Sequence, residues 1–274
     1  MSDCYSRKFL HLNYSHSCSP TPKQALFERH CHESFEILYV VRGEGKYVVE
    51  GVEYPLKPHT LLLTRPYEFH SVCPDASSEY ERYVIHFELS APVDAAAFLS
   101  ILKSGFGAGH GIYFPMGSLS DTVLSIFTEL DSACEMFEGS SHRTSREETM
   151  FRADLTRLLF FLSRVKPEAV SSGEETVITR VVDYINQNLT GEISLDALAQ
   201  QFFVSKYYLC HAFRRQTGVS IFTYINIKRI AMAQQLLANG EPATSVAYAV
   251  GYRNYSSFYR AFCKQVGHPP AHRR

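Results

Sequence analysis

The stretch SVAYAVGYRNYSSFYRAFCKQVGHPP at residues 245–270 decides the fold of the C-terminal part of this chain. It predicts a helix over 243–250, a tight turn at Gly251 and a second helix from about Tyr255 to Val266. Gly267 follows the second helix, and glycine readily adopts the left-handed conformation that ends a helix. Two helices joined by a short turn form a helix-turn-helix unit, whose second helix is narrow enough to enter the major groove of DNA.

The same pattern occurs once earlier in the chain. It predicts helices over 195–202 and 206–217, and one long helix over 222–238 separates it from the later copy. Ser194 and Ser205 precede the two earlier helices, where a hydroxyl can accept hydrogen bonds from free amide groups. The matching residues are Ala199 with Ala247, Phe202 with Val250, Leu209 with Phe258, Ala212 with Ala261, Phe213 with Phe262, Gln216 with Gln265 and Gly218 with Gly267. A single unit is a weak signal, whereas two units joined by a helix of about 26 Å can reach successive major grooves.

Charge divides the chain in the same way. Residues 176–274 contain 11 Lys or Arg and 4 Asp or Glu, a net charge of +7, whereas the residues before them contain 16 and 24, a net charge of −8. A basic segment beside an acidic one is typical of a nucleic-acid-binding domain attached to a domain with another task. Charge alone is equally compatible with an ordinary solvated surface.

Helix geometry predicts which side chains of the two second helices face DNA. Leu209 and Phe258 lie on the apolar faces, so the opposite faces point outward. The outward residues are Lys206, Tyr207, Cys210, His211 and Arg214 in the first unit, and Tyr255, Ser256, Tyr259, Arg260 and Lys264 in the second. We expect Arg260 to contact guanine, because its planar fork matches the O6 and N7 acceptors. The other basic residues of both helices are expected to contact phosphate groups, which fixes the register without reading the sequence.

A long series of residues runs through both units and carries a family resemblance. The series is Ser194-Leu195, Leu198-Ala199, Phe202, Ser205, Tyr208-Leu209, Phe213-Arg214, Gly218, Tyr224-Ile225, Arg229, Ala233, Leu236-Leu237, Val246-Ala247, Val250-Gly251-Tyr252, Phe258, Arg260, Phe262, Lys264, Gly267 and Pro270. Over the last hundred residues it resembles the AraC-type transcription regulators. The chain departs from that family at its end, where Arg273-Arg274 stands in place of the usual Tyr-Arg.

The resemblance implies specific roles and partners. The family's base-reading positions in the first unit fall on Tyr207, Cys210 and His211, and Arg229 is expected to tie the connecting helix to both units. The implied partners are double-stranded DNA, a small-molecule effector such as a sugar, a second copy of the chain in a homodimer, and RNA polymerase. The implied output is transcription regulation, with activation as the expected direction.

The N-terminal half is predicted to be rich in β-structure. Residues 1–25 are polar and contain two prolines, so we expect an arm outside the core. Short runs over 35–42, 46–50, 60–64 and 80–88 are typical of strands, and Gly and Pro residues separate them. Several short strands with close turns predict a small barrel or sandwich.

Two helices are expected after the barrel, since apolar residues recur at helical spacing over 119–130 and 155–162. The chain is thus expected to have an α+β fold of two domains. Residues 1–165 are predicted to hold the arm, a cupin-like effector-sensing barrel and dimerisation helices, although an intramolecular core explains the helices almost as well. Residues 166–175 are predicted to be a linker, and residues 176–274 an all-α AraC-type DNA-binding domain with two helix-turn-helix units.

Four residues of the barrel form a second constellation, namely His30, His32, Glu36 and His70. Two alternating histidines, a carboxylate and a distant histidine can converge on a divalent ion, and their spacing resembles the metal motif of cupin barrels. Three interpretations are open: groups that orient an effector, ligands of a catalytic metal ion, and histidines with structural hydrogen bonds. We expect the first, with ring surface for an effector from Tyr39 and Tyr47, and with no bound metal. A cupin-type metal-dependent enzyme with an appended DNA-binding domain is the alternative function.

Composition excludes several other classes. With 274 residues, 45% of them apolar and 20% charged, the chain can bury two cores. No apolar run approaches the roughly 20 residues that a membrane-spanning helix needs, so we expect no membrane partner. The seven cysteines are scattered without a C-x-x-C pair, which is typical of thiols in a reducing cytoplasm. The common nucleophile and phosphate-loop motifs are missing, so we expect no catalytic residue, no cofactor and no enzyme.

Overall fold

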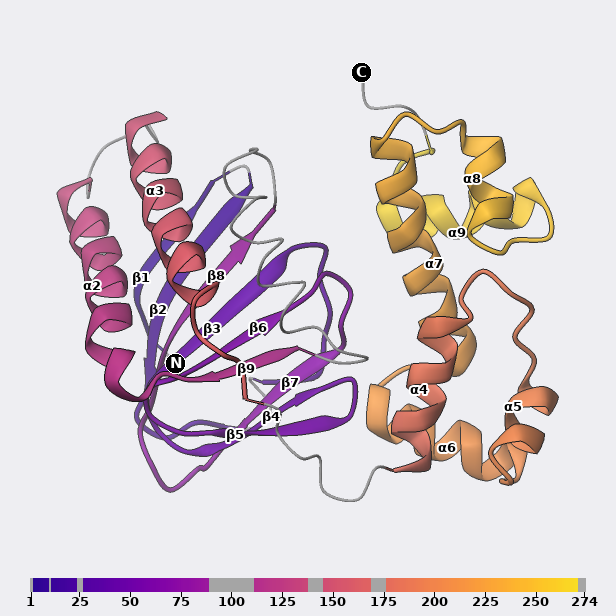
Figure 1. The fold of residues 1–274 in the computed structure, drawn as a ribbon, viewed down its shortest axis with the longest axis horizontal. Coiled ribbons are helices and arrows are strands. Elements are labelled where there is room, and N and C mark those ends of the chain that lie inside the picture. Colours follow the sequence, from indigo (N-terminus) through magenta and orange to yellow (C-terminus); the bar gives the residue numbers. More distant parts are fainter. Residues whose placement is uncertain are drawn as a thin grey trace. The chain divides into compact units, whose positions relative to one another are not determined.

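The structure is a computed structural model that describes residues 2–9, 11–23, 27–88, 111–137, 145–168 and 176–270. The chain forms two compact units, Met1–Gly173 and Glu174–Arg274, and hydrophobic clusters lie within each of them (Figure 1). Most of the expected linker, residues 169–175, lies outside the described residues. The C-terminal Arg273-Arg274 also lies outside them.

Two antiparallel sheets build the first unit. The larger sheet has the strand order β1-β2-β8-β3-β6-β9, and the smaller has the order β5-β4-β7. The strands of the larger sheet are β1 (Ser2–Lys8), β2 (Leu12–Ser19), β3 (Phe35–Arg42), β6 (Thr60–Thr64), β8 (Tyr80–Phe87) and β9 (Ile112–Pro115). Those of the smaller sheet are β4 (Gly45–Val49), β5 (Val52–Leu56) and β7 (His70–Pro74). The expected β-rich domain is confirmed, and β5, β7 and β9 are strands that the sequence reading did not identify.

The residues of the larger sheet alternate between two cores. Leu38 and Val40 of β3 belong to a buried cluster that also contains Tyr47 and Val49 of the smaller sheet, so the two sheets face each other. Ile37, by contrast, belongs to a cluster on the opposite face of the larger sheet. Such alternation between two cores is expected for a strand whose two faces are both buried.

Two helices cover the outer face of the larger sheet, α2 (Ser120–Met136) and α3 (Ser145–Leu162), with a short 3₁₀ turn, η2 (Gly117–Leu119), before the first (Figure 1). Their apolar stripes are buried against the sheet rather than left free. Phe127 of α2 and Leu158 of α3 are both fully buried in that cluster. The two expected helices are confirmed, and packing within the chain accounts for their apolar stripes.

The expectation that residues 1–25 form an arm outside the core is wrong. Strands β1 and β2 pair with each other, and β2 pairs along its whole length with β8. Leu12 and Tyr14 of β2 are buried in the cluster under α2 and α3. The segment was misread because hydroxyl, amide and imidazole side chains alternate with these two residues, and backbone pairing with β8 does not depend on side-chain polarity.

The second unit consists of six helices among the residues that the structure describes. They are α4 (Val177–Gln187), α5 (Leu195–Gln201), α6 (Lys206–Thr217), α7 (Ile221–Ala238), α8 (Ala243–Ala249) and α9 (Tyr255–Val266). Helix pairs α5–α6 and α8–α9 are the two expected helix-turn-helix units, and each lies within a residue of its predicted bounds. Helix α7 has 18 residues, which corresponds to about 27 Å along its axis.

Capping fixes where the two second helices begin and end. The Ser205 hydroxyl accepts from the Tyr208 amide at the start of α6, and the Asn254 side chain accepts from the Ser257 amide at the start of α9. Gly218 and Gly267 end these helices with φ of 84° and 82°, as the sequence predicts.

Arg229 of α7 holds the connecting helix in place. Its guanidinium donates to the carbonyl oxygens of Leu189 and Gly191 at 2.8 and 2.7 Å, and it lies 5.7 Å from the ring centre of Tyr252. The loop after α4 and the second helix-turn-helix unit are thereby attached to the same side chain. The structural role expected for Arg229 is confirmed.

Candidate functional site

The four residues singled out in the barrel come together at one end of the two sheets. One ligand atom each from His30, His32, Glu36 and His70 lies within 4.8 Å of the other three. Glu36 and His70 are buried, His32 is partly buried and His30 is exposed. The cluster therefore reaches from the interior of the unit to its surface.

Backbone pairing brings these residues together although they are distant in sequence. His30 and His70 exchange two backbone hydrogen bonds of 3.0 and 2.9 Å, and the Tyr67 amide donates to the carbonyl of His32 at 2.8 Å. Glu36 follows as the second residue of β3 and faces the interior, like Leu38 two residues later. The segment before β3 is therefore held against the start of β7.

The Glu36 carboxylate is the centre of the cluster. Its Oε1 accepts from the Tyr47 hydroxyl at 2.9 Å, and its Oε2 lies 3.2 Å from Nε2 of His32 and 2.9 Å from Nε2 of His86. Nε2 of His70 lies 3.5 Å from the same Oε2. One carboxylate oxygen thus faces three imidazoles, and the other is held by a phenol.

Electrostatics keep this carboxylate ionised. Burial raises the pKa of Glu36, but the charge of His70 and the hydrogen bonds from the surrounding histidines outweigh burial and hold the pKa well below its ordinary value. Burial lowers the pKa of His70, yet the negative charge of the nearby Glu36 carboxylate outweighs this effect and raises that pKa. A buried anion is thus stabilised by imidazoles, an arrangement suited to holding a polar ligand.

Tyr39 does not join the cluster. It lies on the face of β3 that packs against the helices, where its ring stacks on Phe127 at 5.1 Å. Its hydroxyl is 3.0 Å from Nδ1 of His59 and 3.3 Å from the carbonyl oxygen of Ser120. Because residues of opposite parity on a strand face opposite sides, Tyr39 and Glu36 cannot line one pocket.

Sequence reasoning missed His86 and gave Tyr47 only a stacking role. His86 lies directly opposite Glu36 in the pairing of β3 with β8. The alternation of residues along β8 indicates which way His86 points, since Tyr80 and Val84 lie on the same interior face. The strand partner of Glu36, however, cannot be read from one sequence without the sheet order.

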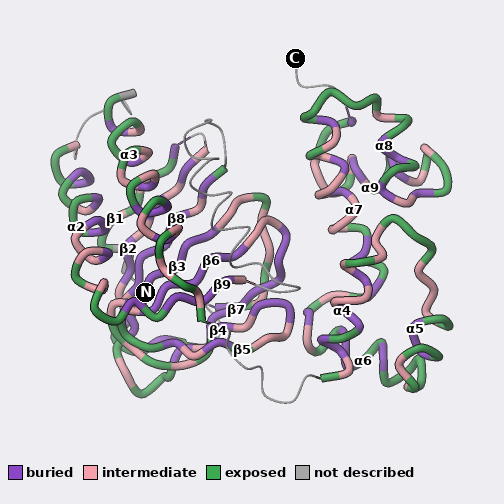
Figure 2. The backbone as a smooth tube through the Cα atoms, in the orientation of Figure 1, coloured by how far each residue is buried: buried purple, intermediate pink, exposed green. Residues whose placement is uncertain are grey.

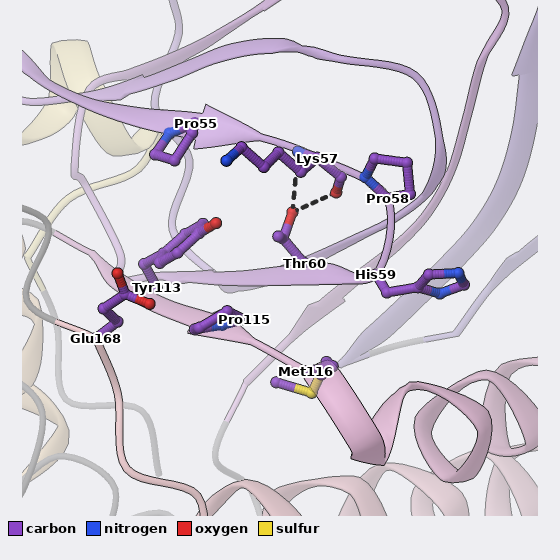
Figure 3. A pocket seen from close by; sticks show the side chains of 10 residues that line it. Pro55, Lys57, Pro58, His59, Thr60, Tyr113, Pro115, Met116 and Glu168 are labelled. Atoms are coloured by element: carbon purple, nitrogen blue, oxygen red, sulfur yellow. Dashed lines mark hydrogen bonds between the residues drawn. The ribbon is translucent and has the colours of Figure 1, made fainter.

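A separate hollow of about 460 Å³ lies at the other end of β6 (Figure 3). Figure 3 shows Pro55, Lys57 and Pro58 along one side and Tyr113 and Glu168 on the other. No residue expected from the sequence to bind an effector lines it. Its titratable lining residues are Lys57, His59, Tyr113 and Glu168, and they do not form a set of converging metal ligands like the one around Glu36, which is therefore the stronger candidate site in this unit.

The predicted DNA-facing residues of α6 are exposed (Figure 2). They are Lys206, Tyr207, Cys210, His211 and Arg214. Leu209 and Phe213 are fully buried on the other side. The rings of Tyr207 and His211 lie 4.3 Å apart one turn from each other, and Lys206 pairs with Asp196 of α5 at 2.6 Å.

Helix α9 presents a similar face. Ser256, Tyr259, Arg260 and Lys264 are exposed, whereas Phe258 and Phe262 are buried. Tyr255 differs from expectation in that it is only half exposed, because its ring packs against the cluster around Phe258. Both second helices therefore offer polar and basic side chains on the side away from their core.

Two family models match the chain, one for each unit. Residues 198–274 match a helix-turn-helix domain, and residues 19–152 match the AraC-like ligand binding domain. The chain belongs to the AraC family of transcription regulators. In this AraC-type regulator the β-sheet unit is the ligand-binding domain and the helical unit is the DNA-binding domain. None of the helices in its described residues is both long and apolar enough to cross a membrane.

Several relatives cover most of the chain. The uncharacterized HTH-type transcriptional regulator YfiF of Bacillus subtilis strain 168 is 25% identical over 255 residues, which are 88% of this chain and 76% of that protein. The HTH-type transcriptional activator RhaS of Escherichia coli strain E24377A is 24% identical over 262 residues, which are 94% of this chain and 91% of that protein. These relatives are transcription regulators, and none of the names given is that of an enzyme.

Solved structures also align with this chain. ToxT from Vibrio cholerae O395 aligns with 95% of this chain and 96% of its own, at 12% identity and a TM-score of 0.37. The DNA-binding domain of AdpA, in complex with a target DNA, aligns with 33% of this chain and 83% of its own, at 25% identity and a TM-score of 0.32.

Proposed function

We propose that this AraC-type regulator binds its effector at the cluster around Glu36 and reads double-stranded DNA with α6 and α9. The observation that carries the proposal is the pair of helix-turn-helix units, each with a capped second helix whose outer face is polar and basic. Exposed side chains at the start of such a helix are the ones that reach base edges.

The DNA contacts are proposed from exposure and chemistry. Arg260 is exposed in the middle of α9, and its guanidinium offers the fork that guanine O6 and N7 require. Lys206 pairs with Asp196 on the surface, and such an exposed pair is weak enough for a phosphate group to replace the carboxylate. Lys264 and Arg214 have the position and charge of further phosphate contacts.

The effector site is proposed from the convergence of polar groups. Imidazoles, a carboxylate and a phenol meet at one end of the sheets, and the exposed His30 gives access from solvent. Such a set offers both donors and acceptors, which suits a small molecule rich in hydroxyl or carboxyl groups, such as a sugar or a related metabolite.

We also propose that the regulator acts as a homodimer and that RNA polymerase is a further partner. The apolar stripes of α2 and α3 are buried within the chain, so a dimer interface would use what these helices leave exposed. Met136, Met150 and Phe160 are exposed large apolar residues on α2 and α3, and Phe160 is 55% exposed. They are the proposed centre of that interface.

Fluorescence anisotropy tests the coupling of the two sites. The full-length protein is titrated onto a labelled duplex from upstream of its own gene, with and without each member of a panel of monosaccharides and sugar acids. We expect one compound to change the apparent Kd at least fivefold, the usual size of a coupling between sites. His32→Ala should abolish that change and leave the Kd without compound unaltered.

His59→Asn is the matched control. His59 lies at the opposite end of β6 and has φ of 61°, a conformation that asparagine tolerates. The His59→Asn protein should respond like the wild type. If the His32→Ala protein responds equally well, the effector site lies elsewhere in the regulator.

A further inference from the structure

The three histidines of the cluster are held in one tautomer. Nδ1 of His30 contacts the carbonyl oxygen of Glu28 at 2.9 Å, Nδ1 of His32 that of Ser34 at 2.9 Å, and Nδ1 of His70 that of Glu68 at 2.8 Å. A carbonyl oxygen only accepts hydrogen bonds, so each Nδ1 carries the proton and donates it. In the neutral ring, each Nε2 is then left with a free lone pair.

The Nε2 atoms of His32 and His70 both face the Glu36 carboxylate. Nε2 of His70 is buried and makes no hydrogen bond with the described residues, although it lies 3.5 Å from Oε2 of Glu36. Nε2 of His32 faces the same oxygen at 3.2 Å. Lone pairs opposed at such distances repel unless a proton or a metal ion lies between them.

Protonation of the imidazoles can remove the repulsion between these lone pairs only in part. One imidazolium balances the single charge of Glu36, but three would leave two uncompensated positive charges in a largely buried site, which is costly. A divalent ion accepts all three Nε2 lone pairs at once, and each Nδ1–H still donates to its carbonyl oxygen. A histidine that binds metal through one ring nitrogen usually donates from the other nitrogen to a group such as a backbone carbonyl, which fixes the orientation of the ring.

Glu36 is oriented in the same way. Tyr47 donates to its Oε1, and His86 contacts its Oε2 at 2.9 Å, so the carboxylate is fixed from two sides. Its Oε2 lies 3.2 Å from Nε2 of His32 and 3.5 Å from Nε2 of His70. The ligand atoms lie within 4.8 Å of one another, and around an ion with ligands at about 2.1 Å they would be ~3–4 Å apart, which requires only small side-chain movements.

We propose that His30, His32, Glu36 and His70 bind one divalent ion of the first transition series, such as Zn²⁺. Three imidazoles and one carboxylate favour such ions over Mg²⁺ or Ca²⁺, which prefer oxygen ligands. The sequence alone favours a site without metal; the tautomers and the fixed carboxylate, which only the structure gives, support the opposite conclusion. The inference rests on the proposed function only in placing the ion at the effector site, where open coordination positions would accept hydroxyl or carboxylate oxygens.

Isothermal titration calorimetry of the full-length protein, dialysed first against a chelator, tests the site with Zn²⁺ and with Mg²⁺ as the probes. We expect one Zn²⁺ per chain and no measurable Mg²⁺ binding under the same conditions. Co²⁺ gives a second readout, because its visible absorption spectrum reports the number and kind of its ligands. His30→Ala, which removes an exposed side chain, and Glu36→Gln should each weaken Zn²⁺ binding at least tenfold.

The variants need a matched control and a check of folding. His11→Gln removes a histidine outside the cluster that also contacts a glutamate, Glu88 at 2.9 Å, and should leave Zn²⁺ binding unchanged. Circular dichroism and the apo Tm should show that each variant folds, and Zn²⁺ should raise the Tm of the wild type and of His11→Gln only. The inference is overturned if the wild type binds no Zn²⁺, or if His30→Ala and Glu36→Gln bind it as tightly as His11→Gln.

The two proposals fail separately. If Zn²⁺ does not bind but His32→Ala abolishes the response of DNA binding to an organic effector, the effector site stands and the metal site does not. If Zn²⁺ binds as expected but no compound and no ion alters DNA binding, the metal site stands and the proposed coupling does not.

Discussion

Phe203 and Gly251 occupy equivalent positions in the turns of the two helix-turn-helix units, and both have a positive φ, of 54° and 92°. At Gly251 an added Cβ would lie 2.9 Å from the Leu189 and Thr190 carbonyl oxygens and from the Arg229 guanidinium, so the position requires glycine. At Phe203 the same conformation is taken by a bulky residue that is 95% exposed. Its ring therefore contributes little packing to offset the backbone strain.

Substitutions at these two positions should have opposite effects on stability. Phe203→Gly should stabilise the DNA-binding unit by about 0.5–1 kcal/mol, because relief of the left-handed strain exceeds the entropy that glycine gains in the unfolded chain. Gly251→Ala should destabilise it by about 2 kcal/mol or more. Urea unfolding of residues 176–274 followed by circular dichroism measures both, and a Phe203→Gly protein that is less stable than the wild type would refute the assignment of strain.

Arg260 and Lys264 should differ in what they contribute to DNA binding. Arg260→Ala is expected to weaken specific binding by about 1–3 kcal/mol and to relax the preference at one base position. Lys264→Ala should weaken binding to every sequence similarly, since a phosphate contact carries no sequence information. Anisotropy titrations with specific and scrambled duplexes compare them; equal losses on both duplexes for both variants would make Arg260 a phosphate contact.

The sequence predicted correctly which side chains point outward where that depends on the period of a single helix. The outward residues of α6 and most of those of α9 followed from a period of 3.6 alone. It failed where direction depends on a strand partner. Tyr39 was assigned to the effector site although it packs against Phe127, and His86 was missed although it lies opposite Glu36.

Strand β2 and helix α2 are joined by one carboxylate. Asp131 of α2 accepts from the hydroxyls of Tyr14 and Tyr83 and lies 2.8 Å from Nδ1 of His16, whose Nε2 is 3.0 Å from Glu81. Burial lowers the pKa of His16, but the hydrogen bonds and charges of the two carboxylates outweigh burial and raise it above the ordinary value. His16 thus carries its charge more readily in the folded protein than in the unfolded chain.

This contact should make stability depend on pH. A histidine whose pKa is raised on folding contributes its full stabilisation below the unfolded pKa of about 6.5, and loses it as pH rises through the folded pKa. The difference in unfolding free energy between the wild type and His16→Gln should therefore be largest near pH 6 and shrink toward pH 9. Urea unfolding at a series of pH values measures it, and a difference that grows with pH would contradict the assignment.

The elements that sequence reading found are those with a clear apolar period. Helices α5–α9 and strands β3, β4, β6 and β8 were identified with small errors in their bounds. Helices α2 and α3 were identified as well, but the predicted segments 119–130 and 155–162 are clearly shorter than the helices. Strands β1 and β2 were missed, because their polar residues alternate with few apolar ones and their pairing with β8 is a long-range contact. Strand β7 was missed for a different reason, since His70 and Ser71 interrupt the apolar run although both are buried.

On the scale of the whole molecule, the chain has two units with opposite charge. Residues 176–274 contain both helix-turn-helix units, the helix between them and a net charge of +7. This fragment should therefore bind DNA without the ligand-binding domain. Its affinity should fall steeply with salt, because phosphate contacts release counterions.

Anisotropy titrations of the isolated fragment at a series of KCl concentrations test this prediction. A Lys264→Ala fragment is the matched control and should show a shallower salt dependence by about one counterion. A folded, helical fragment with no affinity for DNA at low salt would show that the ligand-binding domain is needed for binding.

Alternate residues of β3 and β8 face opposite sides of the larger sheet, and the two sides have different neighbours. Glu36 and His86 face the histidine cluster, while Tyr39 and Tyr83 on the same strands pack against Phe127 of α2. A displacement of β3 or β8 at the cluster would therefore also shift the contacts with Phe127 on the other side of the sheet. We expect occupancy of the cluster to act on α2 along this path, across the thickness of one sheet.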